Sequence, residues 1–271
     1  MKLASLLVCL AFPWISASAG DAPLPNAQVL RERLIASAEK QQKERENYSC
    51  SVHHEDFELK GDGSVKKKET TLQDRFFVNG WSVNHVLERD GKPLSKDDAK
   101  KEQERIDKLV KKYSDAKRAD KAQQEWSRQL DVFIKALRFN NGHREQRDGR
   151  SIVVYDLAGD PNFRPQKVEE RFAQALTGKI WIDEEVGLPD ELKLLTNRDV
   201  KVAAGIGSLN KGFQLHLVWQ RQPDGVWLIK VAEGSGDARA FFVHERFRFH
   251  EQTEQCHLFS VNTQQKIQAS K

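Results

Sequence analysis

Six Asp-Gly or Asn-Gly dipeptides punctuate the chain, and most of them stand beside runs in which apolar and polar residues alternate. Both residue pairs suit tight hairpins, because the central positions of such turns need positive φ. Alternation of this kind is typical of strands with one face on a core. The repeated pattern therefore predicts an antiparallel meander. The dipeptides are Asp62-Gly63, Asn79-Gly80, Asp90-Gly91, Asn141-Gly142, Asp148-Gly149 and Asp224-Gly225.

The N-terminus has the pattern of a secretory signal peptide. Lys2 supplies a short positive start, residues 3–15 are mostly apolar, and Ala17-Ser18-Ala19 fits the small-residue cleavage rule. The apolar stretch is too short to span a bilayer. We therefore expect residues 1–19 to be a signal peptide cleaved after Ala19, a periplasmic location, and no transmembrane anchor.

The charge of the mature chain gives no indication of a nucleic-acid partner. Cleavage would remove one lysine from 44 basic residues and none of the 40 acidic ones, so the net charge falls from +4 to +3. Such a balance, together with export, argues against nucleic acid. About 250 residues without a Gly/Ser or Pro linker suit one domain. We expect residues 20–271 to form that domain, as a monomer.

Helical patterns occur at the N-terminus and in one insertion. Asn26 can cap a helix that runs to about Arg45. A helical insertion is expected at about 95–137, where Ser95 with an acidic residue three positions on marks a helix start. Within it, a charged helix precedes a second helix over about 122–137 that has a broad apolar stripe. The second helix is predicted to pack on the sheet.

The rest of the chain is predicted to form strands. Alternation marks roughly ten strands, and Phe172 with Leu176 is assigned to one of them and 192–206 to another. Strands with segregated helices indicate the α+β class. An antiparallel sheet of this length must curl, close or split into layers. We expect a curled antiparallel sheet, a half-open β-barrel, with helices covering its concave face.

Bulky aromatic and aliphatic residues are expected to line the concave face. One interpretation is a cavity for an apolar ligand, since curled sheets with helices over the mouth commonly enclose such ligands. The other is a core filled by the protein's own side chains. The predicted lining consists of Trp81, Val83, Trp126, Leu130, Phe133, Leu217, Trp219 and Phe241.

Two cysteines remain after cleavage, and they lie near the two ends of the predicted sheet. In an oxidising compartment Cys50 and Cys256 can form one disulfide that joins the first strand to the last. Two buried free thiols are the alternative, because the sequence gives no distance between them.

The sequence predicts no catalytic residue, no cofactor and no metal ion, and hence no enzyme. Neighbouring residues on a strand point to opposite faces, so His53 and His54 do not share an ion. Acidic pairs such as Asp97-Asp98 are inevitable among forty carboxylates and do not indicate a perturbed pKa. A hydrolase would need a buried polar cluster beside a cleft, and the sequence shows none.

Three local stretches resemble the periplasmic lipoprotein carriers and their relatives, the outer-membrane lipoprotein-sorting superfamily. They are Tyr48-Ser49-Cys50, Asp90-Gly91-Lys92-Pro93-Leu94, and Gly178-Lys179-Ile180-Trp181-Ile182-Asp183 leading into Gly187-Leu188-Pro189. The likeness covers roughly Ala27 to Cys256. Within that superfamily, the chain is most similar to secreted bacterial members.

The resemblance implies an incomplete β-barrel with a helical lid. In the carriers an arginine inside the barrel holds the lid shut, and Arg75 is the candidate equivalent. It also implies a binding or carrier function for an apolar ligand, a lipid or a lipoprotein acyl chain. The alternative is a non-catalytic structural or interaction module with a filled core and an envelope protein as partner.

Overall fold

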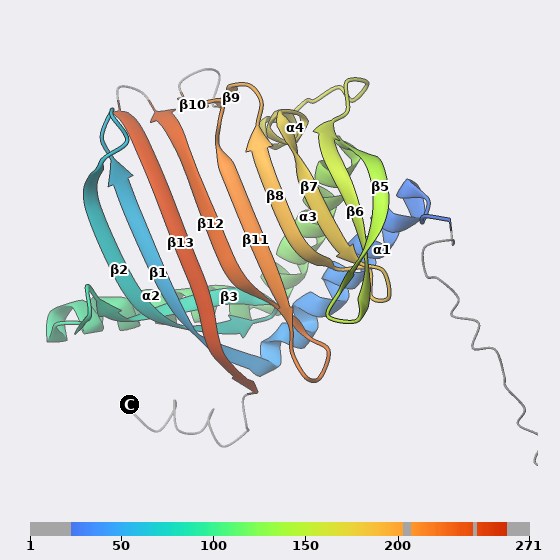
Figure 1. Cartoon of the computed structure of the whole chain (residues 1–271). Helices are drawn as coiled ribbons and strands as arrows, with labels where there is room; N and C mark the ends of the chain where they lie inside the picture. The colour runs from blue at the N-terminus through green and yellow to red at the C-terminus, as the bar shows by residue number, and fades with distance from the viewer. Residues whose placement is uncertain (1–22, 203–206, 241–242, 259–271) are drawn as a thin grey trace, which may run out of the picture.

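A computed structural model describes residues 23–202, 207–240 and 243–258 of the chain (Figure 1). The predicted signal peptide and Phe241 lie outside these described residues. The longer strands are β1 (Tyr48–Leu59), β2 (Val65–Val78), β3 (Trp81–Arg89), β5 (Leu137–Arg147), β6 (Arg150–Gly159), β7 (Leu176–Asp183), β8 (Pro189–Thr196), β11 (Gln214–Arg221), β12 (Trp227–Ala240) and β13 (Val243–Leu258). The short strands are β4 (Lys92–Pro93), β9 (Val200–Val202) and β10 (Gly207–Leu209). The helices are α1 (Ala27–Glu44), α2 (Lys96–Ser114), α3 (Ala116–Lys135) and α4 (Val168–Gln174), with a 3₁₀ turn η1 (Arg45–Asn47).

The described strands form one sheet of 13 strands. Its order is β4-β3-β2-β1-β13-β12-β11-β8-β7-β6-β5, with β10 and β9 attached beside β12. Neighbouring strands pair in antiparallel fashion along this path, and β4 and β5 are left as its two ends. The sheet is therefore curled but not closed, and the predicted α+β class and half-open architecture are confirmed. The count of roughly ten strands missed the three short ones.

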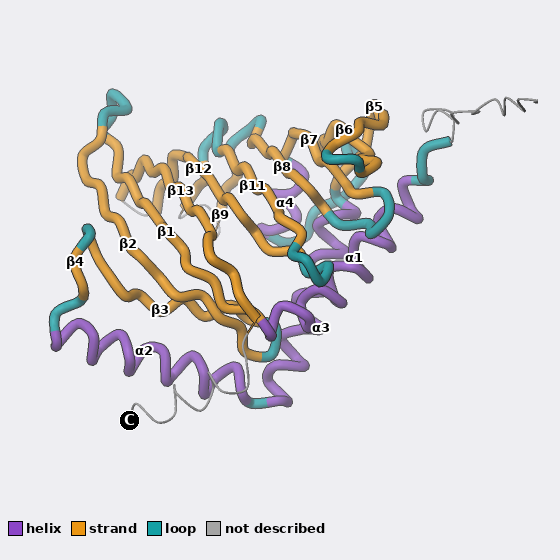
Figure 2. Tube along the Cα trace, turned by 60° about the horizontal axis from the view of Figure 1, so that its bottom comes forward, coloured by secondary structure: helices purple, strands orange, loops and turns teal. Residues whose placement is uncertain are grey.

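The helices lie together on the concave face of the sheet. Figure 2 shows α1, α2 and α3 along one side of it, with α2 below β3 and α3 running beside α1. The 3.6-residue period of these helices gives each one apolar stripe that needs a partner surface. The sheet supplies that surface on the helix side, and its other face carries no helix among the described residues.

The predicted helix starts are confirmed by their caps. Asn26 Oδ1 accepts a hydrogen bond from the backbone N–H of Gln28 at 2.8 Å, and Ser95 Oγ accepts one from Asp98 at 3.2 Å. The second insertion helix differs from the prediction at both ends. It begins at Ala116, six residues earlier, and ends at Lys135, so that Leu137 opens β5 instead.

Two strand assignments were wrong. Phe172 lies in α4, whose first turn is fixed by Glu170, because its carboxylate accepts hydrogen bonds from two preceding backbone N–H groups. The ring of Phe172 reaches the sheet and meets Phe213 edge-on at 5.9 Å between centroids, which explains its strand-like apolar pattern. The run over 192–206 is not one strand, since β8 ends at Thr196 and β9 begins at Val200.

Five of the six dipeptides stand in turns between strands. In three of these hairpins both central residues have positive φ, as at Asn79 (49°) with Gly80 (77°). Asn141-Gly142 is the exception. It lies inside β5, where the register slips between Asn140 and His143, so the pair forms a β-bulge. The dipeptide signal therefore marked local backbone conformation correctly but overcounted hairpins.

The main hydrophobic core fills the concave side over β5 to β8. Leu30 and Leu34 of α1 and Ile134 of α3 pack there against strand residues that are nearly all inaccessible to solvent. This half of the trough is thus filled by side chains. The strand residues are Leu137, Val153, Tyr155, Leu157, Leu176, Ile180, Ile182 and Leu194.

No helix within the described part of the chain combines the length and the apolar composition that crossing a bilayer requires.

Candidate functional site

A pocket of about 300 Å³ remains on the helix side, at the end of the sheet where α1 meets β1 to β3. We call it the inner pocket. Its walls come from α1 and η1, from α3, and from strands β1, β2, β3, β12 and β13. They are Gln42, Arg45, Cys50, Arg75, Phe77, Gly80, Trp81, Ser82, Trp126, Leu228, Ile229, Glu251 and Thr253. The wall is thus part aromatic and aliphatic, part polar and charged.

The turn at Gly80 lets α1 close one side of the inner pocket. A Cβ at Gly80 would stand 2.5 Å from Gln42 Cγ, so only glycine leaves room for that side chain. Asn79 Nδ2 donates a hydrogen bond to the carbonyl of Tyr113 at 2.6 Å, and the ring of Tyr113 stacks on Trp81 at 5.9 Å. The end of α2 therefore holds Trp81 in place.

Arg75 lies within the sheet part of the pocket wall. It forms an ion pair with Glu251 at 2.8 Å and donates a hydrogen bond to Asn84 at 2.9 Å. Both charged side chains are mostly buried, at 13% and 14% exposure. Burial would raise the pKa of Glu251, but hydrogen bonds from His54 and Arg75 outweigh it and lower that pKa to about 2. Arg75 thus ties β2, β3 and β13 together, and a lid-holding role stays a prediction.

Arg45 has a different environment. Its Nε donates to the backbone carbonyl of Trp227 at 3.0 Å, while no ion pair to Arg45 occurs within the described residues. Burial lowers the pKa of this guanidinium, because desolvation penalises its charge. The inner pocket therefore contains two arginines and one glutamate, and the glutamate is already used by Arg75.

Three polar atoms in the wall have no hydrogen-bond partner among the described residues. They are Gln42 Oε1, Trp81 Nε1 and Thr253 Oγ1. Gln42 is 6% exposed and Thr253 is 8% exposed, so their side chains are well removed from bulk solvent. An unpaired buried polar group is costly and uncommon. Three such atoms belong to residues around this one hollow.

The structure brings some of the predicted lining residues together and separates others. Trp81 and Trp126 line the inner pocket, as does Arg75. Trp126, Leu130 and Phe133 line a second pocket of about 310 Å³ between α3 and α4, so Trp126 stands between the two. Val83 is fully buried. Leu217 and Trp219 are half-buried on β11 and line neither of these two pockets.

Cys50 and Cys256 form a disulfide in the structure, with their sulfur atoms 2.14 Å apart. The bond joins β1 to β13 and links residues 206 positions apart in sequence. Cys50 is also part of the inner pocket wall and of a small core with Tyr48, Val226 and Leu228. The bond therefore fixes the strand pair behind the pocket.

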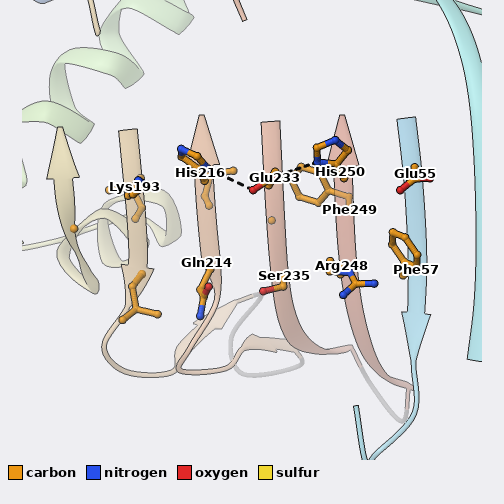
Figure 3. A pocket seen from close by; sticks show the side chains of 15 residues that line it. Glu55, Phe57, Lys193, Gln214, His216, Glu233, Ser235, Arg248, Phe249 and His250 are labelled. Carbon is orange, nitrogen blue, oxygen red and sulfur yellow. Dashed lines mark hydrogen bonds and ion pairs between the residues drawn. The ribbon is translucent and has the colours of Figure 1, made fainter. Parts of the chain in front are cut away.

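A third hollow, of about 720 Å³, crosses the opposite face of the sheet (Figure 3). We call it the outer groove. Leu194 and Leu215 belong to the helix-side packing, so the residues flanking them in sequence point outward. Figure 3 shows two rows of such side chains, each of which runs across the neighbouring strands. One row is Lys193, His216, Glu233, His250 and Glu55, and the other is Leu195, Gln214, Ser235, Arg248 and Phe57.

The first row is a chain of charge contacts across neighbouring strands. Glu233 accepts from His250 Nδ1 at 2.8 Å and lies 3.4 Å from His216 Nδ1. His216 Nε2 is 2.9 Å from Glu191, which also meets Lys193 at 2.6 Å. Burial opposes ionisation of Glu191, but hydrogen bonds from Lys193, Arg147 and His216 lower its pKa to about 2.

Sequence reasoning did not find Arg45, Gln42 or the outer-groove row. Arg45 sits at the end of a charged helix, where its type and spacing match its exposed neighbours. His216, Glu233 and His250 come together only through the register of β11, β12 and β13. The sequence did contain a signal for the outer groove. All three residues occupy polar, outward-facing positions in strands whose residues alternate between the two faces.

No protein-family model and no curated protein matches this chain. Among solved structures, the chain is similar to a DUF1329 family protein from Desulfovibrio piger, with 8% identity over 88% of this chain and 95% of that one and a TM-score of 0.31. It is also similar to MucB in complex with MucA(peri), with 10% identity, 87% and 100% coverage and a TM-score of 0.25. A Pseudomonas aeruginosa MucA/MucB complex gives 10% identity, 88% and 100% coverage and a TM-score of 0.25. At TM-scores this low, no ligand or partner is transferred to this chain.

Proposed function

We propose that this protein is a non-catalytic binding or carrier protein of the periplasm, which receives an apolar ligand such as a lipid or a lipoprotein acyl chain. The inner pocket would hold one end of the ligand. The observation that carries the proposal is the meeting of Trp81 and Trp126 with unpartnered polar atoms in one hollow beneath the helices. Predicted export and the Cys50–Cys256 disulfide support an oxidising compartment.

The size of the inner pocket limits what it takes in. If each non-hydrogen atom occupies about as much space as a liquid water molecule, ~30 Å³, the pocket holds roughly ten atoms. A long acyl chain would therefore extend beyond it. The half-buried Leu217 and Trp219 and the pocket beside Leu130 and Phe133 offer apolar surface for that extension. Burial would contribute about 25 cal/mol per Å² of apolar surface.

Native extraction tests this function. Protein purified from the cell envelope without detergent is extracted with organic solvent, and the extract is examined by mass spectrometry. We expect a lipid in stoichiometric amount. Trp81→Ala should lose it, because that ring forms part of the pocket wall. Phe57→Ala is the aromatic control and should retain it, since Phe57 lines the outer groove on the opposite face of the sheet and neither the inner pocket nor the α3–α4 pocket. An empty wild-type protein that also shows no fluorescence change with fatty acid would refute the function.

A second candidate function is protein interaction, and the outer groove favours it. The groove is larger than the inner pocket and lies on the face that carries none of the described helices, while the core over β5 to β8 is filled. Its walls contain Phe57 and the exposed Leu195, and the guanidinium carbon of Arg248 lies 4.2 Å from the centre of the Phe57 ring. An envelope protein could use both.

Cross-linking in the envelope distinguishes this second function. A photo-reactive residue in place of Ser235, inside the groove, should capture a defined protein, whereas one in place of the exposed Lys43 on α1 should not. Equal patterns from both positions would exclude a specific partner at the groove.

A further inference from the structure

The inner pocket contains one cation that no described residue neutralises. Arg75 and Glu251 are paired at 2.8 Å, so their charges cancel. Arg45 lines the same pocket and makes one described contact, through Nε to a backbone carbonyl at 3.0 Å. Its terminal guanidinium nitrogens have no carboxylate in reach among the described residues. An uncompensated charge that is half removed from water is expensive unless something pairs with it.

The unpartnered groups nearby complete a set of donors. Trp81 Nε1 is a donor only, and Thr253 Oγ can donate its proton. The amide of Gln42 has no described hydrogen bond at either end, so it can present its N–H₂ group by turning over. A guanidinium and several donors beside aromatic and aliphatic side chains match an oxygen anion on an apolar chain.

We propose that the ligand of the inner pocket is an amphiphile with an anionic oxygen head group, either a carboxylate or a phosphate, and that Arg45 binds this head group. This inference rests on the proposed function, because it names the class of ligand for the same pocket. Trp81 and Thr253 would donate further hydrogen bonds, and the chain would run along Trp126 and Ile229.

Ligands with equal chains and different heads test the inference. Decanoate, decyl phosphate, decanol and decyltrimethylammonium are titrated below their micelle concentrations, with tryptophan fluorescence as the readout. We expect decanoate or decyl phosphate to bind at least about tenfold more tightly than decanol, since a hydrogen bond to a charged group contributes this much. The stronger of the two anions identifies the head-group chemistry. Equal binding of decanol and both anions would overturn the inference while leaving an apolar-ligand function intact.

Arg45→Gln locates the effect. It should remove most of the preference for the anion and leave decanol binding unchanged within about twofold. Lys43→Gln, which removes an exposed charge two residues away on α1, is the matched control and should keep the preference. A preference that survives Arg45→Gln would contradict the role of Arg45.

Two further outcomes separate the possible failures. No binding of any ten-carbon ligand would defeat the proposed function itself. Glutarate, which has carboxylates but little chain, should bind far more weakly than decanoate. If glutarate binds as tightly, the pocket receives acidic groups such as those of a peptide, and the amphiphile assignment is wrong. Circular dichroism of each variant before titration shows whether it is folded.

Discussion

The polar residues around the inner pocket are of two kinds: some have hydrogen-bond or ion-pair partners, and others have none among the described residues. The ion pair of Arg75 with Glu251 secures the sheet behind the pocket. The terminal nitrogens of Arg45, Gln42 Oε1 and Thr253 Oγ1 have no polar partner among the described residues. Satisfied groups resist movement, and unsatisfied groups favour whatever supplies the missing contact. We therefore expect substitutions at Arg75 or Glu251 to change stability, and substitutions at Arg45 to change the proposed binding.

Glu251→Gln should destabilise the protein by about 3 kcal/mol, because it leaves Arg75 charged, mostly buried and unpaired. Urea unfolding at pH 7 measures the change. Glu254→Gln on the same strand is the control. Glu254 is exposed, lies 4.0 Å from His53, and accepts a hydrogen bond from Gln252 Nε2 at 2.7 Å that a glutamine oxygen can also accept. It should change stability by less than about 0.5 kcal/mol. Equal effects of the two substitutions would show that the buried ion pair is not special.

Gly80→Ala should cost more stability than Gly91→Ala. Both glycines have positive φ, at 77° and 71°, so both changes carry the same backbone penalty of about 1 kcal/mol. Only the Cβ at position 80 would meet a neighbour, Gln42 Cγ at 2.5 Å, while nothing lies within 4 Å of position 91. Overpacking adds about 1 kcal/mol or more. Matched unfolding curves for the two variants would mean that α1 yields freely at this contact.

At the scale of elements, the pairing of β1 with β13 unites the sheet, because it joins the N-terminal strands to the last strand of the chain's meander. The Cys50–Cys256 disulfide lies on this pair. A cross-link over so long a loop restricts the unfolded chain strongly in the entropic model. It thereby favours a pairing between strands at opposite ends of the chain, which a simple meander would lack.

Replacing Cys50 and Cys256 together by serine should lower the free energy of unfolding by about 5 kcal/mol, the value expected for loops longer than 100 residues. The comparison is made under identical urea gradients, with thiol alkylation in denaturant to verify the oxidised parent. Two alkylated thiols in the unreduced parent would refute the bond. An unchanged midpoint in the double variant would show that the bond adds no stability.

The sequence predicted elements best where local chemistry decides the backbone. Asn26 and Ser95 marked two helix starts correctly, because capping depends on residues within one turn. Prediction from the sequence failed where a residue distant in the chain determines the backbone conformation. Asn141-Gly142 became a bulge beside Tyr155 of the neighbouring strand, and Phe172 took an apolar position on the sheet from a short helix.

Charge contacts at the scale of the whole molecule predict a stability that falls in acid. The pKa values of Glu191 and Glu251 are lowered from 4.5 to about 2 in the folded protein. Their ionised forms are therefore stabilised by folding. This contribution is fully present above pH 4.5, the unfolded value, and is lost as the pH falls through 2.

The double substitution of Glu191 and Glu251 by glutamine should flatten the pH dependence of the free energy of unfolding between pH 4.5 and 2. The pKa of His54 is raised from 6.5, chiefly by its hydrogen bond to Glu251, so its contribution is present below pH 6.5 and declines above it. Urea midpoints measured across pH 2 to 8 give both trends. An acid slope in the double variant as steep as in the parent would assign acid unfolding to other carboxylates.

The sequence predicted the architecture more completely than it predicted the residues of the candidate site. The strand, insertion and meander order follows from alternation and turns, and it holds in the structure. The sequence left open whether the concave face holds a cavity or a filled core, and the structure has both. Side chains of α1 and α3 fill the trough over β5 to β8, and two pockets of about 300 and 310 Å³ adjoin Trp126. Apolar pattern alone does not distinguish lining from filling. Arg45 was missed because the fold decides which described carboxylates come near it, and none forms an ion pair with it.

The most direct test is a crystal structure of the protein with decanoate, at a concentration where fluorescence titration shows saturation. We expect the ligand in the inner pocket, with its carboxylate within hydrogen-bond distance of Arg45 and its chain against Trp126. Ligand density in the outer groove alone, or an inner pocket closed by its own side chains in the saturated crystal, would contradict the assignment.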